Sequence, residues 1–314
     1  MGGPAPVVTA VRPAAAVTAL VAAVVAVAWL LAQPLLSPSA AAARAVADVA
    51  AVTALGLAAV HLLDAPRFRD DLMDRASTPL IGAAALWLVA ELVRLVLGAA
   101  EAAEVSVGRL GVHTVWEFVT LTAAGRSGVL SLLAATAIAA TAMVLRPTPA
   151  VRLAAAGAAA TGLAARAVTG HLAEGTLSAT AVVVHALAAA VWCGVLAALA
   201  LTVHSRGQWA RVLPRYSQLS LVCVAVLLLG GIASAVLRLS GPAALLTTGY
   251  GRILLAKLLA TTVLLALAAR YRSNWVAAAA AHRVTAAQSR RKSVVELTVM
   301  VVALTLAAAL TVTG

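Results

Sequence analysis

Residues 177–201, with the sequence LSATAVVVHALAAAVWCGVLAALAL, form an apolar run of 25 residues that contains no Asp, Glu, Lys or Arg. A helix of about 20 apolar residues crosses the hydrocarbon core of a bilayer, so this run is long enough to span it. Alanine and leucine, which favour helices, are frequent in the run, and apolar and polar residues do not alternate as they do in membrane strands. The run therefore predicts a transmembrane helix.

Similar runs occur along the whole chain. The same length criterion predicts nine transmembrane helices, at residues 14–32, 45–63, 79–98, 128–145, 151–168, 177–201, 217–238, 250–270 and 294–313. Of the 314 residues, 63% are hydrophobic and 11% are charged, whereas soluble domains average about 45–50% and about 25%. The predicted fold class is all-α, a polytopic integral membrane helix bundle. We expect the first run to be a retained helix, although a signal peptide is the alternative at this position.

The basic residues predict the orientation of these helices. The net charge is +12, and 15 of the 23 Lys and Arg residues lie in segments that nine spans would place on the same side as the N-terminus. The positive-inside rule makes that side cytoplasmic, which puts the C-terminus outside the cytoplasm. Because loop asymmetry accounts for most of the charge, we expect contact with the lipid bilayer and no nucleic-acid partner. The predicted location is the cytoplasmic membrane.

Candidate metal ligands gather toward the predicted outer side. His113, His171 and Glu174 lie in outer segments, where imidazole and carboxylate groups can capture a metal cation. His185 lies inside the sixth predicted span, roughly 12 Å below the outer surface at a rise of about 1.5 Å per residue. An ionisable residue at that depth is a functional candidate. The alternative for His185 is a neutral histidine that is hydrogen-bonded to a neighbouring helix.

Other polar residues inside the predicted spans favour structural interpretations. Glu91 and Arg94 are three residues apart and can form an ion pair on one helix face. Lys257 either extends to the outer interface or pairs with a buried acid. Cys193 and Cys223 lie at similar predicted depths, either as ordinary buried residues, which we favour, or as a soft pair that could bind Cu(I).

The second half of the chain resembles a known family. Four segments carry the resemblance to the copper resistance protein D family: HLAEGTLSATAVVVHALAAAVWCG from His171, RYSQLSLVCVAVLLLGGIASAVLRL from Arg215, TTGYGRILLAKLL from Thr247 and SVVELTVMVVALTLAAAL from Ser293. Together they cover roughly residues 171–312, and Cys193 and Tyr216 depart from the family pattern. The first four predicted spans look like the N-terminal helical extension of longer members. The resemblance thus implies residues 1–150 as an N-terminal extension of four spans and residues 151–314 as a copper resistance D-like domain of five spans.

The resemblance implies copper ion transport across the cytoplasmic membrane and copper resistance. In this interpretation the outer carboxylates and His171 capture the ion, and His185 passes it into the bundle. A periplasmic copper-binding protein is the implied partner, and no enzymatic activity is expected. Two alternatives remain, namely a membrane haem or electron-transfer protein with histidine axial ligands and a non-catalytic accessory subunit.

Overall fold

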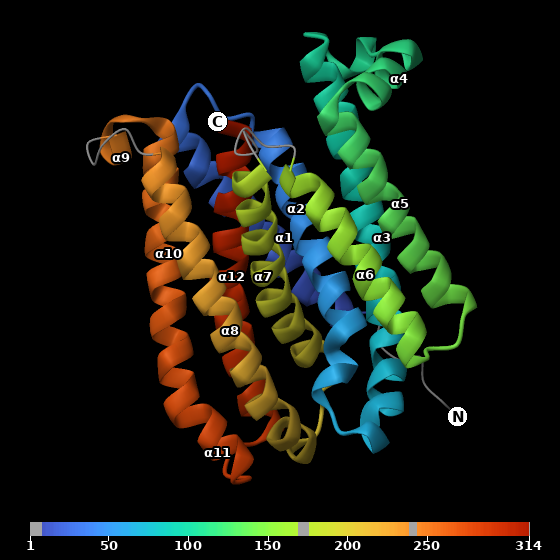
Figure 1. Ribbon diagram of the computed structural model, residues 1–314, viewed down its shortest axis with the longest axis vertical. Helices are drawn as coiled ribbons and strands as arrows, with labels where there is room; N and C mark the ends of the chain where they lie inside the picture. Colours follow the sequence, from blue (N-terminus) through green and yellow to red (C-terminus); the bar gives the residue numbers. More distant parts are fainter. Residues whose placement is uncertain (1–7, 169–175, 239–243, 314) are drawn as a thin grey trace.

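The computed structural model describes residues 8–168, 176–238 and 244–313, and these ranges are mostly helical and contain no β-strand. Figure 1 shows a bundle of long helices joined by short turns. The helices are α1 (Val8–Ala32), α2 (Pro38–Ala59), α3 (Arg69–Ala102), α4 (Val112–Leu121), α5 (Ala123–Val144), α6 (Pro149–Val168), α7 (Thr176–Thr202), α8 (Arg206–Arg238), α9 (Ala244–Thr247), α10 (Gly249–Tyr271), α11 (Ala277–Ala280) and α12 (Ala286–Thr313). A π-helical segment, Arg272–Val276, joins α10 to α11.

The predicted number of membrane spans is confirmed for the described part of the chain, in which nine helices are long and apolar enough to cross a membrane. Several helices begin before the predicted spans, and the largest extensions are in α3 and α8. α3 begins at Arg69 instead of residue 79, and α8 begins at Arg206 instead of residue 217. A hydropathy criterion detects only the apolar part of a helix, whereas backbone hydrogen bonding continues through the polar turns outside the hydrocarbon core. Both helices also contain an internal proline, which membrane helices tolerate.

The bundle has two distinct ends (Figure 1). The short helix α4, which the sequence analysis did not predict, packs against α3 and α5 at one end, and α11 lies at the opposite end. We call these the α4 end and the α11 end. The turns between α2 and α3, α5 and α6, and α7 and α8 also lie at the α11 end, so the segments predicted to be cytoplasmic come together there. The orientation of the two ends in the membrane stays a prediction.

Helix α2 forms the centre of the bundle, packing against α1, α3, α6, α7 and α12. Its buried face consists largely of alanines, and small residues allow membrane helices to approach closely. The closest approach joins Gly56 of α2 to Gly194 of α7, where a Cβ atom added to either glycine would overlap the backbone of the other helix. The division of the chain at residue 150 stays a prediction, and α2 packs against helices from both sides of it.

Candidate functional site

His185 lies on α7 and packs against α8. A Cβ atom added to Gly230 of α8 would lie 3.3 Å from His185 Nδ1, so the absence of a side chain at Gly230 makes room for the ring. The backbone of Leu227 in α8 interacts with the imidazole, but Nδ1 is buried and makes no hydrogen bond within the described residues.

Lys257 of α10 is the charged group that interacts with His185 in the structure. The sequence analysis expected Lys257 either to extend to the outer interface or to pair with a buried acid. Arg252, in the first turn of α10, donates a hydrogen bond of 2.7 Å from Nε to the carbonyl of Leu31 near the end of α1. Hydropathy alone could not reveal the proximity of Lys257 to His185, because it depends on how α10 and α7 are rotated in the bundle.

The other predicted metal ligands are not brought to His185 by the described residues. His113 lies on α4, where its side chain is 84% exposed and its Nδ1 is 3.4 Å from a carboxylate oxygen of Glu117. The main packing partners of α4 are α3 and α5, whereas α7 packs mainly against α2, α6, α8 and α12. His171 and Glu174 lie outside the described residues. A shared metal site for these side chains therefore stays a prediction.

Two buried cysteines approach a buried glutamate nearer the α11 end. Cys193 of α7 lies in the neighbourhood of Cys223 of α8 and of Glu296 of α12. Glu296 is 3% exposed and forms no salt bridge within the described ranges. No group of three or more His, Cys, Asp or Glu side chains in the described residues is arranged to hold a metal ion. The cysteines and Glu296 thus do not form a ready-made metal centre.

The predicted pair of Glu91 and Arg94 is present, with Arg94 Nη2 at 2.5 Å from Glu91 Oε1. It belongs to a larger network that connects α2, α3 and α6. Arg166 of α6 lies 3.3 Å from Glu91 Oε2 and also pairs with Asp48 of α2, and Arg44 lies 3.9 Å from Asp48. Three guanidinium groups thus face two carboxylates. The network carries one excess positive charge, so it is a poor site for a metal cation.

A second charge cluster joins the turn after α2 to α8 at the α11 end. Asp64 is fully buried and accepts hydrogen bonds from Arg211 Nε at 3.0 Å, from Arg211 Nη2 at 3.2 Å and from the backbone of Ala65 at 2.8 Å. Burial would raise the pKa of the Asp64 carboxyl, but these hydrogen bonds and the Arg211 charge together hold the pKa below its usual value. The Arg211 guanidinium also lies 3.8 Å from the centre of the Phe68 ring. These contacts fix the helices on which the candidate site lies.

Two family models match the chain. Residues 35–180 match the model described as Copper resistance protein D-like, N-terminal domain, and residues 210–310 match the model described as Copper resistance protein D. The second match lies within the range 171–312 where the sequence resemblance was found. The first covers most of the spans for which the sequence analysis found only a general likeness. No curated protein and no solved structure matches the chain.

Proposed function

We propose that this chain, which belongs to the copper resistance protein D family and is thus a membrane protein of copper resistance, transports copper ions across the cytoplasmic membrane. In this proposal, His185 binds the ion in transit. The conclusion depends chiefly on one observation, the buried Nδ1 of His185 without a hydrogen-bond partner in the described residues. Neutral imidazole is a common copper ligand. A histidine that served only to fill the core would be expected to satisfy both ring nitrogens.

The surroundings of the ring support the same proposal. Gly230 of α8 carries no side chain and leaves room beside the imidazole, where an added Cβ atom would lie 3.3 Å from Nδ1. Nδ1 therefore faces a position that no other side chain of the described residues satisfies by a hydrogen bond.

Lys257 favours transient over permanent binding. Its ammonium group acts on His185 electrostatically, and a positive charge there repels a copper cation bound at Nδ1. A transported ion must bind well enough to enter a site and weakly enough to leave it. We therefore place His185 on a pathway and not in a storage site.

Capture of the ion is assigned to the side of the membrane where α7 begins. His171 and Glu174 precede α7 in the sequence, and His113 belongs to α4 at the corresponding end of the bundle. An extracytoplasmic copper-binding protein would deliver the ion to these groups. This arrangement requires the predicted orientation, with a cytoplasmic N-terminus and an extracytoplasmic C-terminus.

The substitution His185→Gln tests the proposal, because glutamine keeps a polar side chain of similar size but its amide is a poor copper ligand. Purified full-length protein is reconstituted into vesicles that contain a fluorescent copper chelator, and copper flux, bound copper and Tm are measured. We expect copper flux and bound copper to fall about tenfold or more, in the range seen when metal sites lose supporting groups, with Tm close to that of the wild type. His204→Gln, at an exposed position beyond α7, is the matched control and should leave copper flux unchanged. Unchanged flux with a lowered Tm in His185→Gln would make His185 a structural histidine and refute its role in transport.

A further inference from the structure

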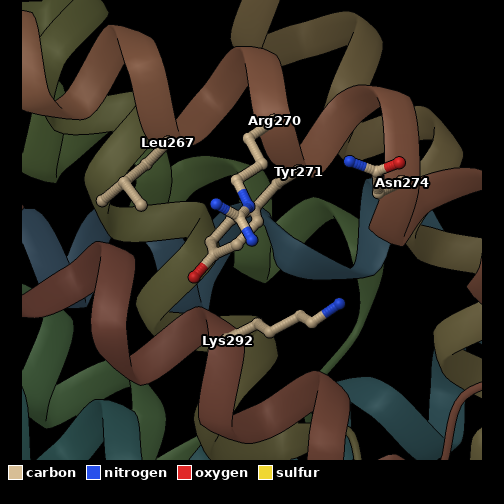
Figure 2. Close-up of a pocket in the computed structure, with 5 residues that line it drawn as sticks. All are labelled: Leu267, Arg270, Tyr271, Asn274 and Lys292. Carbon is tan, nitrogen blue, oxygen red and sulfur yellow. The ribbon is translucent and has the colours of Figure 1, made fainter.

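A cavity of about 430 Å³ lies at the α11 end, where α10 ends and α12 begins. Figure 2 shows the side chains that line it, Leu267, Arg270 and Tyr271 of α10, Asn274 of the π-helical segment and Lys292 of α12. Its volume is in the usual range of about 300–1,000 Å³ for ligand pockets. The proposed copper pathway does not use this cavity.

The lining carries two positive charges and no acidic residue. Neither Arg270 nor Lys292 forms a salt bridge with a carboxylate of the described ranges. Lys292 Nζ lies 5.9 Å from the centre of the Tyr271 ring. This cation–π contact favours a position of the Lys292 ammonium group beside the cavity. The amide of Asn274 adds a hydrogen-bond donor that carries no charge. The lining is therefore suited to an anion with several acceptor oxygens.

The cavity is shaped by well-packed elements. The π-helical segment Arg272–Val276 interrupts the α-helical pattern directly beside it, and such interruptions occur often at functional sites. Trp275 is buried against Tyr271 and Trp209, while Arg272 donates hydrogen bonds of 2.9 Å to the carbonyl and the hydroxyl of Ser217 in α8. These contacts hold the segment in place, so the cavity does not depend on a loose surface loop.

The position of the cavity indicates the source of the anion. α10 lies at an edge of the bundle (Figure 1), with a largely exposed apolar surface that includes Leu255, Leu258, Leu259 and Val263. This lipid-facing surface ends at Arg270, on the side that the positive-inside rule makes cytoplasmic. Basic pockets between membrane helices on that side bind the headgroups of anionic lipids. We propose that the cavity binds the phosphate of an anionic phospholipid headgroup, held by Arg270, Lys292 and Asn274.

Lipid titration of the purified full-length protein in detergent tests this site. Phosphatidylglycerol is added to the wild type, to the double variant Arg270→Gln/Lys292→Gln and to the charge-matched double variant Arg146→Gln/Arg283→Gln, and affinity is read from the increase in Tm. Arg146 and Arg283 are exposed, belong to the same end of the bundle and do not line the cavity. We expect the first double variant to bind phosphatidylglycerol at least about tenfold more weakly, which corresponds to about 1.4 kcal/mol. The second should remain within about twofold of the wild type, and Arg270→Lys/Lys292→Arg should retain binding.

Two results would overturn the proposal. An equal loss of phosphatidylglycerol affinity in both double variants would show that lipid binding depends only on the total charge of the α11 end. An equal increase in Tm with inorganic phosphate alone would assign the cavity to a free phosphate ion. If Arg270→Gln/Lys292→Gln does not fold, Arg270→Gln alone gives the same test at an exposed side chain. Copper flux measured in parallel separates a lost lipid site from a lost transport function.

Discussion

Replacing Glu91 with glutamine removes the carboxylate that Arg94 and Arg166 share. Glu91 is fully buried, at 2.5 Å from one guanidinium and 3.3 Å from the other. In the substituted protein, three guanidinium groups face only the carboxylate of Asp48, so the excess positive charge rises from one to two. Removing one partner of a buried ion pair costs about 3–5 kcal/mol, because the remaining charge is left without compensation. We expect Glu91→Gln to destabilise the protein by that amount.

Arg94→Gln should be much milder. It leaves Glu91 paired with Arg166 and removes the excess charge of the network, so only the two hydrogen bonds from Arg94 to Glu91 Oε1 are lost, at a total of about 2 kcal/mol. The double variant should fall between the two single variants, since it keeps the native excess of one charge. Thermal unfolding of the purified protein in detergent, supported by a denaturant titration, measures all three.

Arg75→Gln is the control on the same helix, because Arg75 pairs with Asp71 at the surface and exposed pairs contribute at most about 1 kcal/mol. Equal losses for Glu91→Gln and Arg94→Gln would refute this reasoning, because they would mean that the two residues form an isolated pair. A larger loss for Arg94→Gln would refute it as well.

Three further predictions concern packing, pH and topology. Gly56→Ala should destabilise the protein by about 1–3 kcal/mol, because the new Cβ atom would overlap the carbonyl of Gly194. Gly82→Ala should not destabilise the protein, because there is open space around its new Cβ atom. Thermal unfolding compares the two variants. Asp64→Asn should destabilise the protein at pH 7, and the difference in Tm from the wild type should shrink as the pH falls below about 4. The reason is that a carboxyl with a lowered pKa stabilises the fold only while it is ionised. Equal differences in Tm at pH 7 and pH 3 would contradict this. Reporters fused after Arg290 and at the C-terminus should lie on opposite sides of the membrane, and cytoplasmic signals from both would show that one span is assigned wrongly.

Local sequence is enough to predict the helices of this protein. A bilayer requires about 20 apolar residues per helix, and a helix satisfies its backbone hydrogen bonds within its own segment. Each span can therefore be recognised without knowledge of its neighbours, which is why nine spans were predicted and nine are present in the described part of the chain. The ion pair of Glu91 and Arg94 was predictable for the same reason, because three residues along one helix fix the distance between them.

Contacts between helices could not be predicted in this way. Arg166 pairs with Asp48 across 118 positions of the chain, and Arg211 bonds to Asp64 across 147. Hydropathy does not specify which face of a helix meets which neighbour, because lipid and protein interior are similarly apolar and small residues decide the close approaches.

One feature of the candidate copper site could likewise be predicted from the sequence, and the others depend on the packing of the helices. The depth of His185 followed from its position in an apolar run, whereas its unpartnered Nδ1 and the nearby Lys257 depend on how α7, α8 and α10 pack. The cavity beside Arg270 and Lys292 likewise depends on the packing of α10 against α12 next to the π-helical segment. Apolar length is a property of one segment, but a binding site needs the relative rotation of several helices, and that is set by the packing of their side chains.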